Sequence, residues 1–232
     1  MKPICLICAR GGSKGIPNKN TRIIAKKPLI AHTIEDALDS GLFSHVVVST
    51  EDRKIAGISK EYGAEIPFVR PKKLAGDITP VGDVFLHAIK KMYSLGYQFN
   101  IFVNRDCTVP FIQTRDMAGT IDLLIKEKCD AVYGVYRQHL NPYFNMMEIN
   151  SKGFLRLCKK LKERPRSRQE APVVYQLNGL FTYDAKKFLK FGNPIMSRAL
   201  PYEIPVERGL MIDTEIEFRI AEVLFNLGLY KK

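Results

Sequence analysis

The feature that most constrains this fold is a regular alternation of short apolar runs with longer amphipathic stretches. Over the first 136 residues, the apolar and β-branched runs predict strands, and the stretches with apolar residues at a helical period predict helices. The predicted strands are residues 4–8, 45–50, 100–104 and 130–136, and the predicted helices are residues 28–40, 52–62, 81–95 and 114–128. Strands alternating with helices of this length are typical of a mostly parallel sheet with helices on both faces. We therefore predict an α/β protein whose ligands bind at the carboxyl ends of the strands.

From residue 141 onward this alternation breaks down. The expected elements there are a hairpin at residues 144–149 and 153–157, short extended runs at 173–177, 180–183 and 199–205, and a closing helix at 213–227. The two runs at 173–177 and 180–183 flank Asn178-Gly179, a turn signal. No internal repeat and no clear linker divides the chain. We expect one domain over residues 1–232, in which residues 141–172 form an insertion that contacts a second subunit in a homodimer.

Length and composition fit a packed domain. The chain has 232 residues, of which 46% are hydrophobic, and this is enough for one large α/β domain. No apolar run approaches the roughly 18 residues that a membrane helix needs. The apolar stretch at the N-terminus is too short for a signal peptide. The five cysteines are scattered and do not suggest a disulfide framework. We expect a cytoplasmic protein with no membrane partner.

The chain is strongly basic, with a net charge of +12 and a pI near 9.5. This charge favours acidic partners such as nucleotides, phosphosugars or nucleic acid. Basic residues are densest in residues 9–20 and 152–168, and the second run is as consistent with a solvated surface loop as with a binding patch. The sequence has no basic strand with interleaved aromatic residues of the RNA-recognition type. A nucleic-acid partner is therefore not expected.

The first predicted strand runs directly into a glycine-rich basic loop, residues 9–20, with the sequence ARGGSKGIPNKN. Its glycines let the backbone turn sharply and approach a ligand closely, and consecutive free N–H groups form a concave site for anions. Arg10, Lys14 and Lys19 add positive charge to the same turn. The spacing matches neither the Walker A motif nor the dinucleotide fingerprint. The loop therefore predicts a polyphosphate site that is neither of the ATPase nor of the dehydrogenase type.

Transfer of a phosphoryl or nucleotidyl group depends on positioning and on neutralising charge with Lys, Arg and a divalent metal. Two carboxylates are candidate metal ligands, because Asp106 follows a predicted strand and Asp213 precedes the last predicted helix. Each has a structural alternative: Asp106 can form an Asx turn, and Asp213 can cap its helix. Magnesium usually takes only one or two carboxylates together with phosphate oxygens and water. The sequence alone leaves these alternatives open.

Taken in order, these segments resemble the acylneuraminate cytidylyltransferase family, whose members make CMP-activated sialic acids. The resemblance covers essentially the whole chain and is most specific in the loop of residues 9–20. Four further segments resemble later blocks of the family: VVVSTEDRKIA, FVRPKKLAGD, RQEAPVVYQLNG and IDTEIEF. NPYFNMMEI further resembles a sugar-proximal stretch of the branch that acts on nonulosonic acids. The resemblance implies a Rossmann-like nucleotidyltransferase fold, with a mostly parallel sheet and a small β-rich insertion.

The resemblance also implies a reaction and roles for individual residues. CMP would pass from CTP to an acidic sugar, a 2-keto nonulosonic acid such as sialic or legionaminic acid, with release of pyrophosphate. Arg10, Lys14 and Asp213 would act in catalysis, and Asp213 with Asp106 would hold Mg²⁺ or Mn²⁺. The nucleotide-binding residues would be Ala9, Arg10, Gly11, Gly12, Ser13, Lys14, Asn20 and Arg70, and the sugar-binding residues Asp106, Gln176 and Asn178.

Two positions depart from the family's pattern. Met211 stands where the family often has the first aspartate of an Asp-Ile-Asp metal pair, so that only Asp213 is left. Asp106 stands where a sugar-contacting glutamine is usual. Either one metal site is lost, or Asp106 replaces the missing carboxylate. A cytidylyltransferase for another 2-keto sugar acid, such as Kdo, is the nearest alternative function. A CTP-binding pseudoenzyme or an RNA-binding module is the more distant one.

Overall fold

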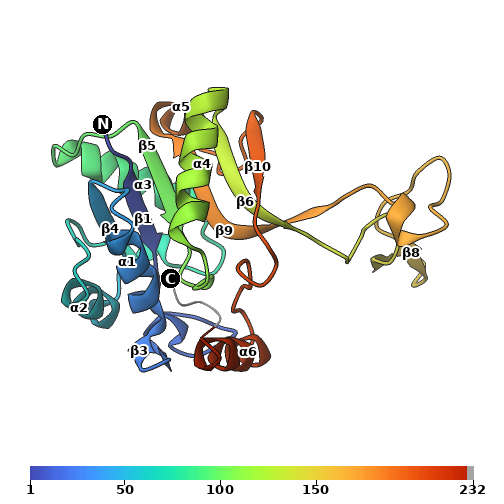
Figure 1. Ribbon diagram of the computed structural model, residues 1–232, viewed down its shortest axis with the longest axis horizontal. Coiled ribbons are helices and arrows are strands. Elements are labelled where there is room, and N and C mark those ends of the chain that lie inside the picture. Colours follow the sequence, from blue (N-terminus) through green and yellow to red (C-terminus); the bar gives the residue numbers. More distant parts are fainter. Residues whose placement is uncertain (229–232) are drawn as a thin grey trace.

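A six-stranded sheet forms the centre of the molecule, with the strand order β10-β6-β9-β5-β1-β4 (Figure 1). The computed structural model describes residues 1–228. The strands of this sheet are β1 Ile4–Cys8, β4 His45–Ser49, β5 Ile101–Arg105, β6 Ala131–Arg137, β9 Tyr175–Asp184 and β10 Ala199–Glu203. β9 is antiparallel to both of its neighbours, and the other pairs are parallel. Every strand except β9 therefore presents its carboxyl end at the same edge of the sheet.

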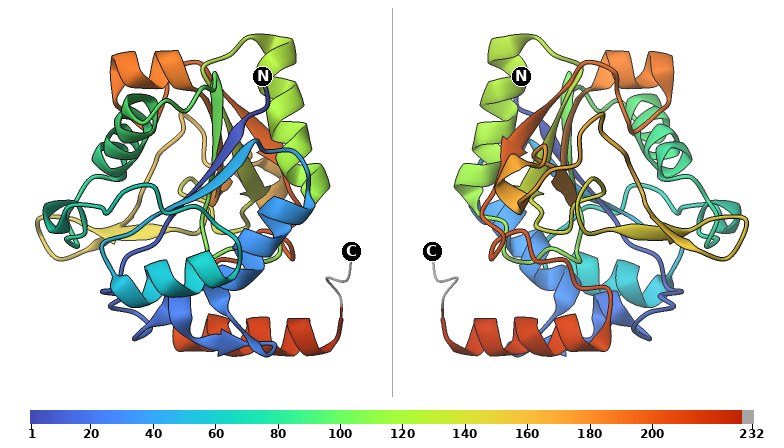
Figure 2. Two further views of the ribbon diagram at one scale, coloured as in Figure 1. Left: turned by 90° about the vertical axis from the view of Figure 1, so that its left-hand side faces the viewer. Right: turned by 90° about the vertical axis from the view of Figure 1, so that its right-hand side faces the viewer.

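Helices cover both faces of this sheet (Figure 2). The covering helices are α1 Leu29–Asp39, α2 Arg53–Glu61, α3 Val81–Ser94, α4 Thr114–Glu127 and α5 Ala185–Phe191. The last helix, α6 Glu215–Asn226, packs beside the sheet against Ile16, Ile24 and Leu29. α3 and α5 pack on one face, whereas α1, α2 and α4 pack on the other. The predicted α/β architecture, a mostly parallel sheet with helices on both faces, is confirmed.

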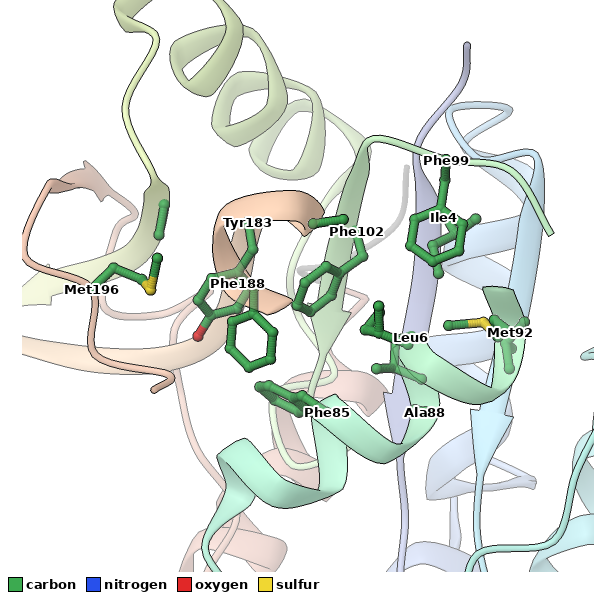
Figure 3. Packing of buried hydrophobic residues seen from close by; sticks show 14 of the residues in the cluster. Ile4, Leu6, Phe85, Ala88, Met92, Phe99, Phe102, Tyr183, Phe188 and Met196 are labelled. Atoms are coloured by element: carbon green, nitrogen blue, oxygen red, sulfur yellow. The ribbon is translucent and has the colours of Figure 1, made fainter. Parts of the chain in front are cut away.

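The alternation of side chains along β1 produces these two layers. Ile4 and Leu6 face α3, where they join Phe85 in the larger core cluster (Figure 3). Cys5 and Ile7 point to the opposite face and pack with α1 and α2. All five side chains are at most 1% exposed. A strand that is buried on both faces reads as a continuous apolar run, which is why the sequence located β1 correctly.

Local signals set the ends of the first helices. The Asp52 carboxylate accepts a hydrogen bond from the Ile55 N–H at 2.8 Å and so caps α2. Gly41 and Gly63 follow α1 and α2 with φ values of +63° and +90°, a left-handed conformation that ends a helix at little steric cost for glycine. The predicted boundaries of these helices therefore lie within one or two residues of the observed ones.

An arm projects from the sheet between β6 and β9 (Figure 1). It comprises residues 138–174, and its far end carries an antiparallel hairpin of β7 Met147–Ile149 and β8 Leu155–Leu157. The predicted hairpin is confirmed, with shorter strands than expected. Apolar side chains of the arm face solvent: Ile149 is 71% exposed, Phe154 68% and Leu155 66%.

One prediction for this region is wrong, because the chain is not broken at Asn178-Gly179. Residues 175–184 form the single strand β9. Gly179 has a φ of +78°, and β6 accommodates it with a register shift between Tyr133 and Val135. A Cβ on Gly134, inside that shift, would clash with Oδ1 of Asn178. The Asn-Gly pair thus marks a bulge within paired strands instead of a turn between them.

The structure adds three elements that the sequence did not predict. They are α5 and a small antiparallel hairpin of β2 Ile23–Ile24 and β3 Lys27–Pro28, which follows the glycine-rich loop. Within residues 1–228, no helix combines the length and the apolar character needed to cross a membrane.

Candidate functional site

The glycine-rich loop leaves the carboxyl end of β1 and folds against the end of β4. The Ala9 N–H donates to the carbonyl oxygen of Ser49 at 3.1 Å, and the Gly11 N–H donates to Oε1 of Glu51 at 2.8 Å. The buried Asn20 side chain donates to the Arg10 carbonyl oxygen at 3.1 Å, which closes the loop on itself. The loop is therefore fixed at its base by strand ends, as a site at the carboxyl edge of a parallel sheet requires.

The same loop also touches the segment that precedes α6. A Cβ on Gly15 would clash with the backbone carbonyl oxygen of Asp213. At the end of the loop, Lys19 Nζ lies 2.9 Å from Oδ1 of Asp213 and donates to the Ile212 carbonyl oxygen at 2.8 Å. Residues almost two hundred positions apart in the sequence are thus held together at this edge. The structure brings a predicted phosphate loop next to a predicted metal ligand.

Two cations of the loop share one carboxylate. Asp77, in the loop before α3, lies 2.9 Å from Arg10 Nη1 and 2.6 Å from Lys14 Nζ. The hydrogen bond from Lys14, supported by the charge of Arg10, holds the pKa of Asp77 below its ordinary value. A cavity of about 290 Å³ lies here, and Arg10, Arg70 and Asp77 are among its lining residues. Its position beside the loop suits a nucleotide.

Arg70 lies beneath the loop, with only 4% of its side chain exposed. Its Nε donates to Ser49 Oγ at 3.2 Å, and its Nη2 donates to the carbonyl oxygens of Ala9 and Ser49. Glu51 lies 3.8 Å away and balances the buried charge. The guanidinium thus supports the start of the glycine-rich loop and also forms part of the cavity wall. Contact with a nucleotide base remains a prediction for this residue.

Asp213 is not the cap of α6. Thr214 holds that position: its side chain accepts from the Glu217 N–H, and the Glu217 carboxylate reaches back to the Thr214 N–H at 2.8 Å. The capping alternative for Asp213 is therefore wrong. Its side chain is 57% exposed and is ion-paired with Lys19 through Oδ1. A carboxylate in this position is open to a cation on its outer side.

Asp106 does form the Asx turn that was its structural alternative. Its Oδ1 accepts from the Thr108 N–H at 3.0 Å and from Thr108 Oγ1 at 2.9 Å. The Thr108 carbonyl oxygen in turn accepts from the Ile212 N–H at 2.8 Å. This hydrogen bond places the Asp106 turn beside the segment that carries Asp213. The two predicted metal ligands thus belong to adjoining segments.

These residues fit a magnesium ion of the kind that relies on phosphate. No group of three or more His, Cys, Asp or Glu side chains suited to a metal occurs within residues 1–228. Magnesium commonly takes one or two carboxylates and fills its other positions with phosphate oxygens and water. The open side of the Asp213 carboxylate, close to the cations of the loop, meets that requirement.

The other predicted sugar-binding residues lie on β9. Oε1 of Gln176 accepts from Gln138 Nε2 at 2.7 Å, where the arm leaves the sheet. Asn178 has no exposed surface, and its Oδ1 accepts from the Leu180 N–H at 3.3 Å. Contact of either side chain with a sugar stays a prediction, and the burial of Asn178 favours a structural role in this conformation.

Sequence reasoning missed two carboxylates of this site. Glu51 was assigned no role in the site, whereas its carboxylate accepts from the Gly11 N–H and neighbours Arg70. Asp77 ends the block FVRPKKLAGD and received no role, although it contacts both cations of the loop. An acidic residue at the end of a Lys-rich, glycine-containing loop was the available signal. Its partners are more than sixty residues away, so the pairing required the fold.

The sequence of this chain is similar to those of known proteins. Residues 4–202 match the sequence profile of the family described as cytidylyltransferase. The CMP-N,N'-diacetyllegionaminic acid synthase of Campylobacter jejuni is 30% identical over 97% of this chain and 95% of its own length. The pseudaminic acid cytidylyltransferase of the same species is 26% identical over 98% of both chains.

A solved structure supports the fold independently. It is that of a CMP:2-keto-3-deoxy-manno-octonic acid synthetase complexed with CTP, and it superimposes with a TM-score of 0.73 over 98% of this chain and 100% of its own. The sequence identity is 17%, so this likeness concerns the fold alone. The nucleotidyltransferase fold expected from the sequence is confirmed.

Proposed function

Because this chain belongs to the cytidylyltransferase family, we propose that it transfers CMP from CTP to a 2-keto nonulosonic acid and releases pyrophosphate. The observation that carries the proposal is the convergence of three segments: the basic loop of residues 9–20, the Asp106 turn and the segment of Asp213. These three segments together supply cations that can bind a triphosphate and a carboxylate that can bind a metal. A nucleotidyl transfer requires both in one place.

The reaction would be an in-line displacement at the α-phosphorus of CTP. The anomeric C2 hydroxyl oxygen of the sugar forms the new P–O bond and gives up its proton to solvent, and the bond between the α-phosphorus and the bridging oxygen breaks as pyrophosphate leaves. Arg10 and Lys14 bind the triphosphate and stabilise the charge that develops on the leaving group. The loop takes the shape that these contacts need through Ala9, Gly11, Gly12, Ser13 and Asn20. Arg70 supports this loop from below.

Asp213 would hold a divalent ion, Mg²⁺ or Mn²⁺, with Asp106 as the second candidate. When bound, such an ion neutralises phosphate charge and lowers the pKa of a coordinated hydroxyl. Lys19 would position the Asp213 carboxylate, since its Nζ contacts only Oδ1 and leaves the other oxygen open. Met211 stands where the family often has the first aspartate of its Asp-Ile-Asp metal pair. This chain therefore offers fewer carboxylates before α6 than the usual pair.

The sugar class is argued from similarity. The two relatives from Campylobacter jejuni are named for legionaminic and pseudaminic acids, and they align over nearly the whole chain. A cytidylyltransferase for Kdo is the second candidate, because a synthetase for that octonic acid shares the fold at 17% identity. The higher identity favours a nonulosonic acid. Gln176 and Asp106 are the proposed contacts to it.

The protruding arm supports a homodimer. Residues 141–172 expose apolar side chains at the end of a segment that has little packing of its own, and exposed apolar surface of this kind marks an interaction site. We assign a second copy of this chain as the partner, in a single-domain subunit spanning residues 1–232. The cysteines are all free thiols, which suits a reducing, cytoplasmic location.

A direct assay tests the activity. The purified protein is incubated with CTP, Mg²⁺ and a panel of 2-keto acids that includes neuraminic, legionaminic, pseudaminic and octonic acids, and pyrophosphate release is measured. We expect turnover with at least one nonulosonic acid. Turnover confined to the octonic acid would favour the second candidate, and CTP binding without any pyrophosphate release would contradict both.

A further inference from the structure

Asp77 is placed to compete with a nucleotide for the cations of the glycine-rich loop. Each oxygen of its carboxylate takes one cation, Oδ1 facing Arg10 at 2.9 Å and Oδ2 facing Lys14 at 2.6 Å. A phosphate oxygen seeks the same donors with the same charge, because guanidinium and ammonium groups bind carboxylate and phosphate alike. The side chain therefore stands where part of the triphosphate would bind.

The Asp77 contacts have the character of a replaceable pair. The side chains of Lys14 and Asp77 are 79% and 41% exposed, and ion pairs at that exposure contribute little to stability. Asp77 lies in a short connection between Arg70, whose N–H donates to the Thr50 carbonyl oxygen, and the start of α3 at Val81. The next residue, Ile78, is 96% exposed. The ends of this connection are fixed, whereas its tip has few contacts to lose.

The position of Asp77 relates it to one part of the substrate. Arg10 and Lys14 are the residues to which we assign the β- and γ-phosphates, and CMP lacks both of these groups. Only species with linked phosphates, CTP and pyrophosphate, would therefore have to displace the carboxylate. Pyrophosphate is also the product that must leave from these same cations.

We propose that Asp77 is an internal competitor of the β- and γ-phosphates, which holds Arg10 and Lys14 in place in the empty enzyme and returns to them as pyrophosphate departs. Asp77 is then a positioning residue that assists product release. This inference rests on the proposed function, because it takes the two cations as the triphosphate site. The depressed pKa of its carboxyl agrees with an anion that is ready to rebind.

Calorimetric binding of pyrophosphate, CTP and CMP tests the inference, with and without Mg²⁺. In Asp77→Asn, pyrophosphate and CTP should bind about three- to tenfold more tightly than in the wild type, as expected for the loss of two exposed ion pairs. CMP should bind unchanged. Inhibition by pyrophosphate should strengthen by the same factor, and kcat and the KM for CTP should both fall, because pyrophosphate leaves more slowly and CTP binds more tightly. Asp77→Glu, which keeps the charge, should restore wild-type values.

Asp83→Asn is the matched control. Asp83 is an exposed carboxylate in the first turn of α3, and it forms no ion pair with another described residue. Its removal subtracts the same charge near the cleft and should leave pyrophosphate binding unchanged. An equal gain in pyrophosphate affinity in Asp83→Asn would show that the Asp77 effect comes from net charge alone, and it would overturn the proposal. Unchanged or weaker pyrophosphate binding by Asp77→Asn would also overturn it, and a weakening seen only with Mg²⁺ would make Asp77 a metal ligand instead.

These outcomes separate the inference from the proposed function. If Asp77→Asn binds pyrophosphate more tightly but the protein turns over no sugar acid, the role of Asp77 as a competitor is supported and the proposed function is contradicted. Normal turnover together with unchanged pyrophosphate binding would do the reverse. Absence of pyrophosphate binding by the wild type and by both Asp77 variants would overturn the competitor.

Discussion

Lys19 Nζ lies 2.9 Å from Oδ1 of Asp213 and ties the end of the glycine-rich loop to the segment before α6. The Lys19 side chain is only 13% exposed, whereas that of Asp213 is 57% exposed. The lysine is thus the fixed member of the pair, and the carboxylate faces solvent. This asymmetry suits an anchor that orients a metal-binding group without covering it.

Replacing Asp213 should abolish activity and spare the fold. In Asp213→Asn, turnover of CTP should fall by about 10²–10³, the usual effect of losing one preorganised charge contact in a transfer reaction. Thermal unfolding should change little, because the side chain is largely exposed. Pyrophosphate release measures the first effect and circular dichroism the second. Asp122→Asn on α4 is the control, and turnover near the wild-type rate in Asp213→Asn would refute the assignment.

Lys14 offers a test with a closely matched control. Lys14→Ala should lower kcat/KM for CTP by about 10²–10³, since the triphosphate loses a cation. Lys126 on α4 has the same side-chain exposure, 79%, and carries the same charge away from the loop. Lys126→Ala should therefore keep wild-type kinetics. A similar loss in both variants would point to net charge instead of a phosphate contact.

Two glycines of the same loop should differ sharply when each gains a methyl group. Gly15→Ala would place a Cβ against the Asp213 carbonyl oxygen, so the loop and the α6 segment must separate. We expect a loss of about 1–3 kcal/mol in the free energy of unfolding, typical of forced overpacking, and a loss of CTP turnover. A Cβ on Gly12 meets no atom within 4 Å, so Gly12→Ala should fold with wild-type stability. Urea denaturation compares the two, and equal stability of both variants would contradict the close approach.

His87 should make the protein less stable at mildly acid pH. Burial lowers its pKa below the ordinary value, and the charges of Lys91, Arg70 and Lys73 act in the same direction. Its buried Nδ1 has no hydrogen-bond partner among the described residues. Between the folded and unfolded pKa values the unfolded chain binds more protons, so the contribution is complete above the unfolded pKa and is lost as the pH falls below it.

The free energy of unfolding should therefore decline between about pH 7.5 and pH 5.5, with His87 contributing around its ordinary pKa of about 6.5. His87→Gln should flatten part of this decline, as measured by urea denaturation at a series of pH values. His139→Gln, at an exposed position of the arm, is the control. The same slope in wild type and His87→Gln would exclude this histidine as a source.

Charged substitutions on the arm should separate the subunits. Ile149→Asp and Phe154→Asp replace exposed apolar side chains of the arm, and burying a carboxylate in an interface is costly. Light scattering after size-exclusion chromatography should show a dimer for the wild type and a monomer for the double variant. Ile125 on α4 is also an exposed isoleucine, at 57%, and Ile125→Asp should stay dimeric. A monomeric wild type would exclude the proposed partner.

The sequence predicted the regular part of the fold well because that part depends on local patterns. The apolar runs of β1 and β4 and the helical period of α3 follow directly from burial on one or both faces. The Asn178-Gly179 pair led to the wrong prediction of a turn. The same two residues occur in turns and in bulges, and only the pairing with the neighbouring strand decides between them. The helix α5 is short and follows β9 without a loop, and its boundary signals, the N-cap Asp184 and Gly192 at its C-terminus, enclose only seven residues.

The candidate site was predictable only in part, for a related reason. The glycine-rich loop is contiguous in sequence, and so its residues could be recognised together. Asp77 and Lys19 act through partners 67 and 194 residues away, respectively, and such pairs exist only after folding. The choice between capping and metal binding for Asp213 likewise depended on Thr214, which took the capping role.

The arm leaves from β6 and returns as β9, and these two strands are neighbours in the sheet. An extension inserted between paired strands begins and ends at nearly the same point. The geometry of the sheet therefore does not constrain the length or the composition of the arm. The register of β6 on β9 and the cleft at the carboxyl ends of the other strands would persist if the arm were shortened, lengthened or exchanged. The arm and the nucleotide-facing edge of the sheet are therefore able to diverge separately.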